Sequence, residues 1–215
     1  TALAIYGARG TEVVCEATSH VVDWELGAAA ALSGLQTRQI PTTDGIVTAD
    51  MVERAIRPPS KLQVQTSLIA IENTHNAAGG RILPLETMQA IQEVAAANGL
   101  PVHLDGARLW NAAAATGVSV ADYASCADTV MVTLSKGLGC PAGSLLAGDD
   151  DVIDDARTVR RRFGGSMRQA GILAAAGLID QPLGLDVTLV EGPAVHAHRD
   201  ACCRQRREDQ HERQH

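Results

Sequence analysis

Short apolar runs alternate with amphipathic stretches along most of the chain. The runs have apolar residues in near-continuous succession, and the stretches between them carry apolar residues at helical spacing. This alternation indicates an α/β fold, in which helices cover both faces of a mostly parallel sheet. Strands are predicted at 11–16, 35–41, 67–73, 101–105 and 129–135, and helices at 24–34, 48–56, 85–99 and 107–116.

The connection after strand 129–135 is too short for another parallel crossover. Only residues 137–142 separate Lys136 from the next apolar run, 143–148, whereas a parallel crossover needs about a dozen residues. Strand 143–148 should therefore run antiparallel to its predecessor. Two further helices are predicted at 149–165 and 166–179, and the acidic start and arginine-rich end of the first suit the helix dipole.

Residues 180–215 differ in character from the rest of the chain. Clear periodicity is lost, and the segment ends in a tail rich in His, Arg, Gln and Glu. We therefore expect one domain over 1–179 and a poorly ordered tail over 180–215.

Composition and charge argue against several classes of function. The net charge of −7 provides no basic surface for nucleic acid or an anionic membrane. No apolar run approaches the roughly 20 residues that cross a bilayer, and the first residues show no signal-peptide pattern. The five cysteines lack C-x-x-C spacing, which favours reduced thiols and a cytoplasmic location.

Two strands end in side chains of complementary chemistry. Asp105 ends strand 101–105, and Lys136 follows strand 129–135. Ligands of open α/β sheets bind beyond the carboxyl ends of the strands, so both side chains are expected in one crevice. An amine there can hold pyridoxal phosphate as a Schiff base, and a carboxylate can keep the pyridine nitrogen protonated. Burial would lower the pKa of the lysine and make its amine nucleophilic.

Each of these residues also has a purely structural interpretation. Asp105 suits the N-cap of the helix that follows it, and Lys136 suits a strand-end lysine whose ammonium reaches solvent. The glycine loop after Lys136 and the acid upstream favour the functional interpretation. Residues 72–76, Glu-Asn-Thr-His-Asn, mark a third polar strand end, although His20 and His75 taken alone are consistent with ordinary loop histidines.

Five segments in a fixed order carry the strongest sequence signal. They are SHVVDWELGAAAALSG (19–34), IENTHNAAGGRILPLE (71–86), VHLDGARLWNAAAATGVS (102–119), VTLSKGLGCPAGSLLAG (132–148) and RFGGSMRQAGILAAAGL (162–178). Together they resemble the low-specificity L-threonine aldolase family. Members are pyridoxal-phosphate lyases of fold type I, the aspartate-aminotransferase-like fold, and are grouped with the aromatic amino-acid β-eliminating lyases.

The resemblance implies cleavage of L-threonine or L-allo-threonine to glycine and acetaldehyde through a lysine aldimine. Lys136 matches the lysine that forms this aldimine, and Asp105 matches the acid paired with the pyridine nitrogen. Arg108 matches the arginine near the cofactor and the substrate carboxylate. Arg168 matches a basic residue that the family keeps close to the cofactor.

The resemblance also implies catalytic roles for two histidines. His20 matches the histidine that stacks on the pyridine ring, and His75 matches the one near the substrate β-hydroxyl, a candidate general base. A histidine pKa near ~6.5 suits removal of the hydroxyl proton, which starts carbon–carbon cleavage. A protonated pyridine ring stabilises the carbanion that results.

The chain departs from the family pattern at both ends. The family's Ser-Gly-Thr turn, which binds the cofactor phosphate, would precede Thr1, and the family's small C-terminal domain is not recognisable after Leu178. We therefore expect an incomplete large domain. The resemblance implies a homodimer or homotetramer with a small amino acid as substrate.

Other functions remain open on the sequence. Another pyridoxal-phosphate β-eliminating lyase, an aldolase for β-hydroxy aromatic amino acids, and a non-catalytic fragment are consistent with the same segments. A nicotinamide dehydrogenase is disfavoured because no strand is followed by the glycine fingerprint. Residues 211–215 match the zinc-protease pattern H-E-x-x-H, but their polar surroundings argue against a catalytic zinc site. We predict only adventitious metal binding at His196, His198, Cys202 and Cys203.

Overall fold

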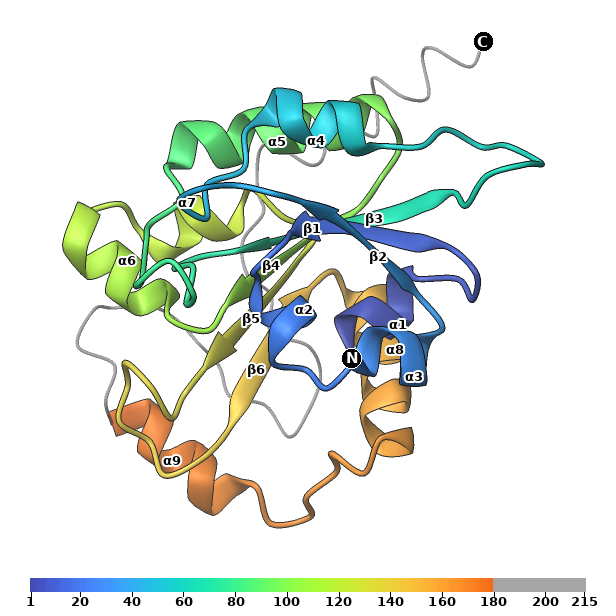
Figure 1. Cartoon of the computed structure of the whole chain (residues 1–215). Coiled ribbons are helices and arrows are strands. Elements are labelled where there is room, and N and C mark those ends of the chain that lie inside the picture. Colours follow the sequence, from blue (N-terminus) through green and yellow to red (C-terminus); the bar gives the residue numbers. More distant parts are fainter. Residues whose placement is uncertain (180–215) are drawn as a thin grey trace, which may run out of the picture.

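One six-stranded sheet organises the computed structural model, which describes residues 1–179 (Figure 1). The strands are β1 (Glu12–Glu16), β2 (Gln36–Ile40), β3 (Thr66–Glu72), β4 (Val102–Gly106), β5 (Thr129–Thr133) and β6 (Ser144–Gly148). Their spatial order is β2-β1-β3-β4-β5-β6, and only β5 and β6 pair antiparallel. The predicted mostly parallel sheet and its antiparallel last strand are therefore confirmed.

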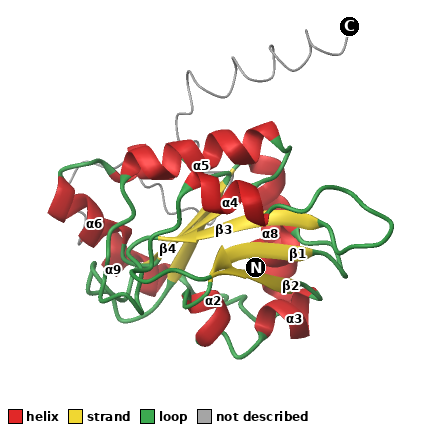
Figure 2. Ribbon diagram, turned by 45° about the horizontal axis from the view of Figure 1, so that its top comes forward, coloured by secondary structure: helices red, strands yellow, loops and turns green. Residues whose placement is uncertain are grey.

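Helices cover both faces of this sheet (Figure 2). One face carries α4 (Ala49–Ala55), α5 (Leu85–Ala97), α6 (Leu109–Thr116) and α7 (Val120–Ala124). The other face carries α1 (Ala2–Tyr6), α2 (His20–Asp23), α3 (Ala28–Ser33) and α8 (Asp150–Arg162). The last described helix is α9 (Gly171–Ile179).

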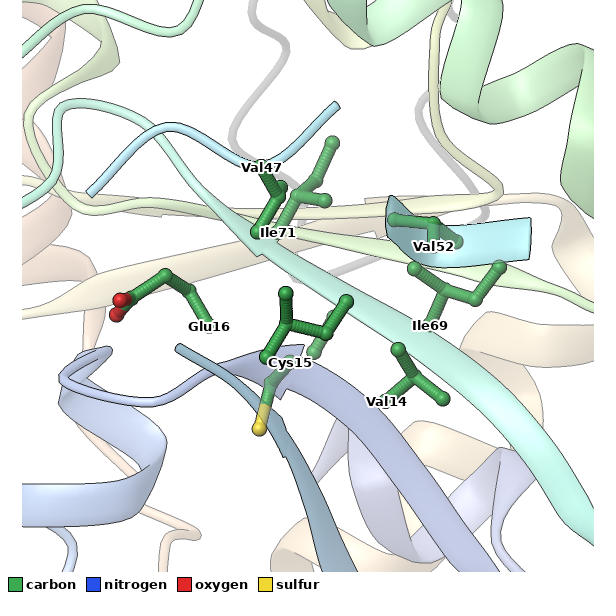
Figure 3. Close-up of a pocket in the computed structure, with 9 residues that line it drawn as sticks. Val14, Cys15, Glu16, Val47, Val52, Ile69 and Ile71 are labelled. Atoms are coloured by element: carbon green, nitrogen blue, oxygen red, sulfur yellow. The ribbon is translucent and has the colours of Figure 1, made fainter. Parts of the chain in front are cut away.

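The face beneath α4 and α5 holds the larger apolar core. Val14, Ile69 and Ile71 from neighbouring strands pack against Val47 and Val52, and no space for a water molecule remains between them (Figure 3). Each fully buried aliphatic side chain of this kind contributes roughly 1.5–3 kcal/mol. Because side chains alternate along a strand, the residues next to these in sequence point to the opposite face of the sheet.

Two helix boundaries follow the sequence signals. The Thr48 hydroxyl caps α4 by accepting a hydrogen bond from the Met51 N–H at 3.3 Å. Gly34 ends α3 with a φ of 69°, a left-handed conformation that glycine adopts without steric cost, and its N–H bonds back to the carbonyls of Ala29 and Ala30.

The helix predicted at 24–34 is wrong in its first part. Leu26 and Gly27 have φ values of 52° and 69°, which a right-handed helix does not tolerate. Instead, the Ala28 N–H bonds to the Glu25 carbonyl at 2.9 Å and closes a tight turn between α2 and α3. The alanines of this stretch all follow the turn, and α3 is therefore confined to Ala28–Ser33.

Three further differences concern helices. The helix predicted from 166 begins only at Gly171, after Gly164 with a φ of 78° interrupts the chain beyond α8. The short α7 was not predicted, and its Ser119 hydroxyl caps it by accepting from the Asp122 N–H at 3.0 Å. The helix expected from residue 107 begins at Leu109.

Several sequence predictions fall outside the described residues. These are the tail 180–215, the metal-binding candidates His196, His198, Cys202 and Cys203, and the 211–215 motif. Within the described part, Cys15, Cys126 and Cys140 are buried and form no disulfide. No helix of residues 1–179 combines the length and apolar character that a membrane span requires.

Candidate functional site

The carboxyl ends of β3, β4 and β5 open onto one hollow of about 210 Å³. This position agrees with the rule that ligands of open α/β sheets bind beyond the strand ends. The predicted residues Asp105, Lys136, Arg108 and His20 all line it. The structure thus brings an acid, an amine, a guanidinium and an imidazole from three separate segments together.

Asp105 is the most enclosed of these groups. It lies in β4 opposite Glu72 of β3 in the parallel register, so both carboxylates project from the same face. Burial is the main cause of a raised pKa of Asp105, and the negative charge of Glu72 acts in the same direction. Its Oδ1 accepts a hydrogen bond from the Ala107 N–H at 3.1 Å. Because α6 begins only at Leu109, Asp105 is not its N-cap.

Lys136 reaches the hollow from the loop after β5. Its side chain is exposed, which corrects the expectation of a buried strand-end lysine. The reason is that β5 ends at Thr133, so the chain has already left the sheet at Lys136. Gly137 allows this path, since a Cβ there would lie 2.7 Å from Asn111 Oδ1.

His20, the first residue of α2, is held at both ends. Its backbone N–H donates to Glu72 Oε2 at 2.7 Å, and its ring Nδ1 lies 2.7 Å from Glu25 Oε1. The tight turn at Leu26 and Gly27 brings Glu25 to this position. An ionised carboxylate can only accept, so Nδ1 carries a proton, and in the neutral ring Nε2 is then an acceptor.

Arg108 is oriented by two residues of the 72–76 segment. Its Nη1 donates to Asn76 Oδ1 at 2.8 Å, and the Asn76 N–H donates to Glu72 Oε1 at 2.8 Å. The guanidinium therefore keeps its remaining donors for the hollow. Two parallel N–H groups of this kind suit a carboxylate or phosphate.

His75 does not line the hollow. Its side chain is 2% exposed, Nε2 lies 2.9 Å from Glu16 Oε2, and Nδ1 accepts from the Ala78 N–H at 3.3 Å. Glu16 lies two residues after Val14 in β1, so both side chains point to the same face of the sheet. This face is opposite the one that carries Asp105. Its predicted role near the substrate β-hydroxyl stays a prediction.

Arg168 lies between α8 and α9 with its side chain exposed, and it does not line the hollow. Its predicted role near the cofactor therefore stays a prediction.

Three further residues line the hollow, although the sequence pattern assigns them no individual role: Glu25, Glu72 and Asn76. The sequence does contain a signal for Glu72. It follows the apolar Ile71 in the same way that Asp105 follows Leu104. Both acids therefore point to the same face of the sheet once β3 and β4 are adjacent. Glu25 gave no such signal, because it was placed inside a helix that the structure does not form.

The set of side chains fits pyridoxal phosphate. The Lys136 amine suits attachment of the aldehyde, and the Asp105 carboxylate, which has no ion pair within the described residues, suits the pyridine nitrogen. The His20 ring provides a flat surface, and Arg108 provides donors for anionic groups. A cationic ring nitrogen beside the Asp105 carboxylate would stabilise its charged form, which burial disfavours.

Comparison with known proteins identifies similar chains. The family model for the beta-eliminating lyases matches residues 1–212. Low-specificity L-threonine aldolase 1 of Arabidopsis thaliana is 41% identical over 174 residues, which is 80% of this chain and 49% of that protein. The low specificity L-threonine aldolase of Escherichia coli K12 is 39% identical over 178 residues, with coverages of 82% and 53%. The chain spans about half the length of the curated relatives it matches.

Solved structures share the fold at lower identity. A threonine aldolase from Leishmania major superposes with a TM-score of 0.73 at 23% identity, over 84% of this chain and 54% of that one. A mutant aspartate aminotransferase from Thermus thermophilus gives 0.61 at 16% identity, over 83% and 48%. The predicted aspartate-aminotransferase-like fold is therefore confirmed.

Proposed function

Since the chain belongs to the beta-eliminating lyase family, we propose that it functions as a pyridoxal-phosphate-dependent aldolase. The reaction would be cleavage of L-threonine or L-allo-threonine to glycine and acetaldehyde. The observation that carries the proposal is that Asp105 and Lys136, which lie 31 residues apart in the sequence, line the same hollow. Identities of about 40% to threonine aldolases support the choice of reaction.

Four residues would hold the cofactor and the substrate. Lys136 would attach the cofactor through its amine, Asp105 would pair with the ring nitrogen, and Arg108 would bind the substrate carboxylate. His20 would lie against the ring. When bound, pyridoxal phosphate supplies a conjugated ring that takes up the electron pair left at the substrate α-carbon.

The proton of the β-hydroxyl needs an acceptor in the hollow. We assign this role to His20, because its Nε2 is an acceptor when Glu25 holds the proton on Nδ1. Glu25 also stabilises the imidazolium that forms once Nε2 takes a proton, as a carboxylate beside a histidine does. His75, which the family resemblance names for this role, is the second candidate for the base.

Product analysis tests this proposal. The full chain with pyridoxal phosphate and L-threonine or L-allo-threonine should release glycine and acetaldehyde in equal amounts, and Lys136→Ala should release neither. Release of ammonia and a keto acid would instead favour the second candidate, a β-elimination, which is consistent with membership of the beta-eliminating lyase family. Absence of both products and of cofactor binding would leave the non-catalytic fragment.

Two further predictions belong to this proposal. The family resemblance described above implies a homodimer or homotetramer. A cytoplasmic location is expected because the five cysteines, an odd number, lack C-x-x-C spacing.

A further inference from the structure

Glu72 uses each of its carboxylate oxygens for a different segment of the chain. Oε2 accepts the His20 N–H at 2.7 Å, and Oε1 accepts the Asn76 N–H at 2.8 Å. Both distances are short, as expected for hydrogen bonds to a charged acceptor. Glu72 thereby joins the start of α2 to the turn after β3, although His20 lies 52 residues away in the sequence.

The bond to His20 takes the place of a missing cap. Ser19 stands at the N-cap of α2, but its hydroxyl donates to the Glu16 carbonyl and caps nothing in α2. The first N–H groups of a helix lack partners within it, and Glu72 satisfies one of them. The position of α2, and with it the His20 ring, therefore depends on a side chain of the sheet.

The bond to Asn76 extends to a second residue of the hollow. With its N–H held by Glu72, Asn76 presents Oδ1 to the Arg108 guanidinium at 2.8 Å. Glu72 itself has no ion pair within residues 1–179, so its charge is not neutralised by an arginine or lysine there. It stands directly beside Asp105 in the sheet register.

We propose that Glu72 is a positioning residue of the hollow, which sets the places of His20 and Arg108 in its lining. It also places a second negative charge beside that acid. The effect on cofactor binding rests on the proposed function, whereas the effects on the hydrogen bonds and on Asp105 do not.

Two measurements without cofactor test the proposal on the full chain. In Glu72→Ala, amide hydrogen exchange should become about tenfold faster at His20 and Asn76, because each loses its acceptor, while the amides between β3 and β4 keep their rates. The carboxyl titration of Asp105, followed by carbon NMR, should shift to lower pH in both Glu72→Ala and Glu72→Gln, because a like charge is removed. A role in folding alone would not move this titration.

Glu72→Gln covers the case in which Glu72→Ala does not fold. It keeps the shape and one acceptor oxygen, so faster exchange is expected at one of the two amides. Glu53→Gln is the matched control, since Glu53 is an exposed acid of α4, and it should leave both measurements unchanged.

Unchanged exchange at His20 and Asn76, an equal acceleration at all amides, or an unshifted Asp105 titration would overturn the proposal. A third measurement distinguishes a failure of the Glu72 proposal from a failure of the proposed function. Both Glu72 variants should bind pyridoxal phosphate about tenfold more weakly than the unsubstituted chain. If the unsubstituted chain does not bind it, the proposed function fails, and the first two measurements still decide the role of Glu72.

Discussion

Glu72 and Asp105 stand opposite each other in the register of β3 and β4, so two carboxylates leave adjacent strands toward one hollow. Two carboxylates at paired positions of adjacent strands repel each other. A cation that binds between or above them reduces this repulsion, which favours its binding. The positive groups that line the same hollow, Lys136 and Arg108, come from loops and helix starts rather than from the sheet. The sheet thus provides two of the acids, Glu72 and Asp105, and the connections provide the positive groups together with the third acid, Glu25.

Asp105→Asn should separate stability from cofactor binding. Burial first, and then Glu72, raises the pKa of Asp105. Above the ordinary pKa the unfolded chain releases this proton more readily than the folded one, so stability is lost as the pH rises through the raised value. Asparagine removes this cost, and the oxygen of its amide can still accept from the Ala107 N–H. Thermal unfolding should therefore show a gain in stability at pH 7 that is absent at pH 3.

The same variant should bind pyridoxal phosphate ten- to a hundredfold more weakly, because it loses a charged hydrogen bond of about 1.5–3 kcal/mol. A titration followed by visible absorbance measures this. Equal binding by Asp105→Asn would show that the ring nitrogen does not depend on this carboxylate.

Acid sensitivity should depend on His103, which is buried in β4 with Nδ1 2.9 Å from Thr129 Oγ1. Burial lowers the pKa of His103 to about 4 from its ordinary 6.5. Below pH 6.5 the His103 ring becomes protonated in the unfolded chain but stays neutral in the folded chain. The stability of the fold therefore falls as the pH drops from 6.5 to about 4. The shift corresponds to a loss of about 3 kcal/mol.

His103→Gln removes this titration and should flatten the pH dependence of urea unfolding across that window. Its stability at pH 7 is a separate quantity, and a modest loss there leaves the prediction intact. The same slope in both proteins would contradict the role of His103.

The His75 enclosure can be tested through a glycine. Gly45 has a φ of 77°, and a Cβ there would lie 2.7 Å from the Ala78 Cβ and 2.8 Å from the His75 Cγ. Gly45→Ala should destabilise the fold by about 2–4 kcal/mol, from backbone strain and overpacking together. Gly79→Ala is the control: its φ is 73° with no atom within 4 Å of the added Cβ, so only strain of about 1 kcal/mol is expected. Equal losses in chemical unfolding would show that the ring is not closely packed.

The sheet was predictable because its signals are local. Near-continuous apolar runs such as 67–73 and 129–135 predict buried parallel strands, and the six-residue loop before 143–148 predicts the reversal of direction. The positions of Asp105 and Lys136 followed from the same reasoning, since strand ends define the crevice.

Features that depend on tertiary contacts were not predictable. The exposure of Lys136 depends on where β5 ends, and the enclosure of His75 depends on Glu16 from a strand 59 residues away. The turn at Leu26 and Gly27 overrides the helix propensity of the alanines around it. A single sequence does not show which residues distant along the chain come into contact.

Attachment of the cofactor to Lys136 is the most direct test of the proposed function. The chain has two lysines, Lys61 and Lys136, and both side chains are exposed, so Lys61 is an internal control for nonspecific reaction. Borohydride reduction in the presence of stoichiometric pyridoxal phosphate, followed by peptide mapping, should label Lys136 in the unsubstituted chain and in Lys61→Ala, and should give no specific label in Lys136→Ala. Equal labelling of the two lysines, or a label that survives in Lys136→Ala, would contradict the account.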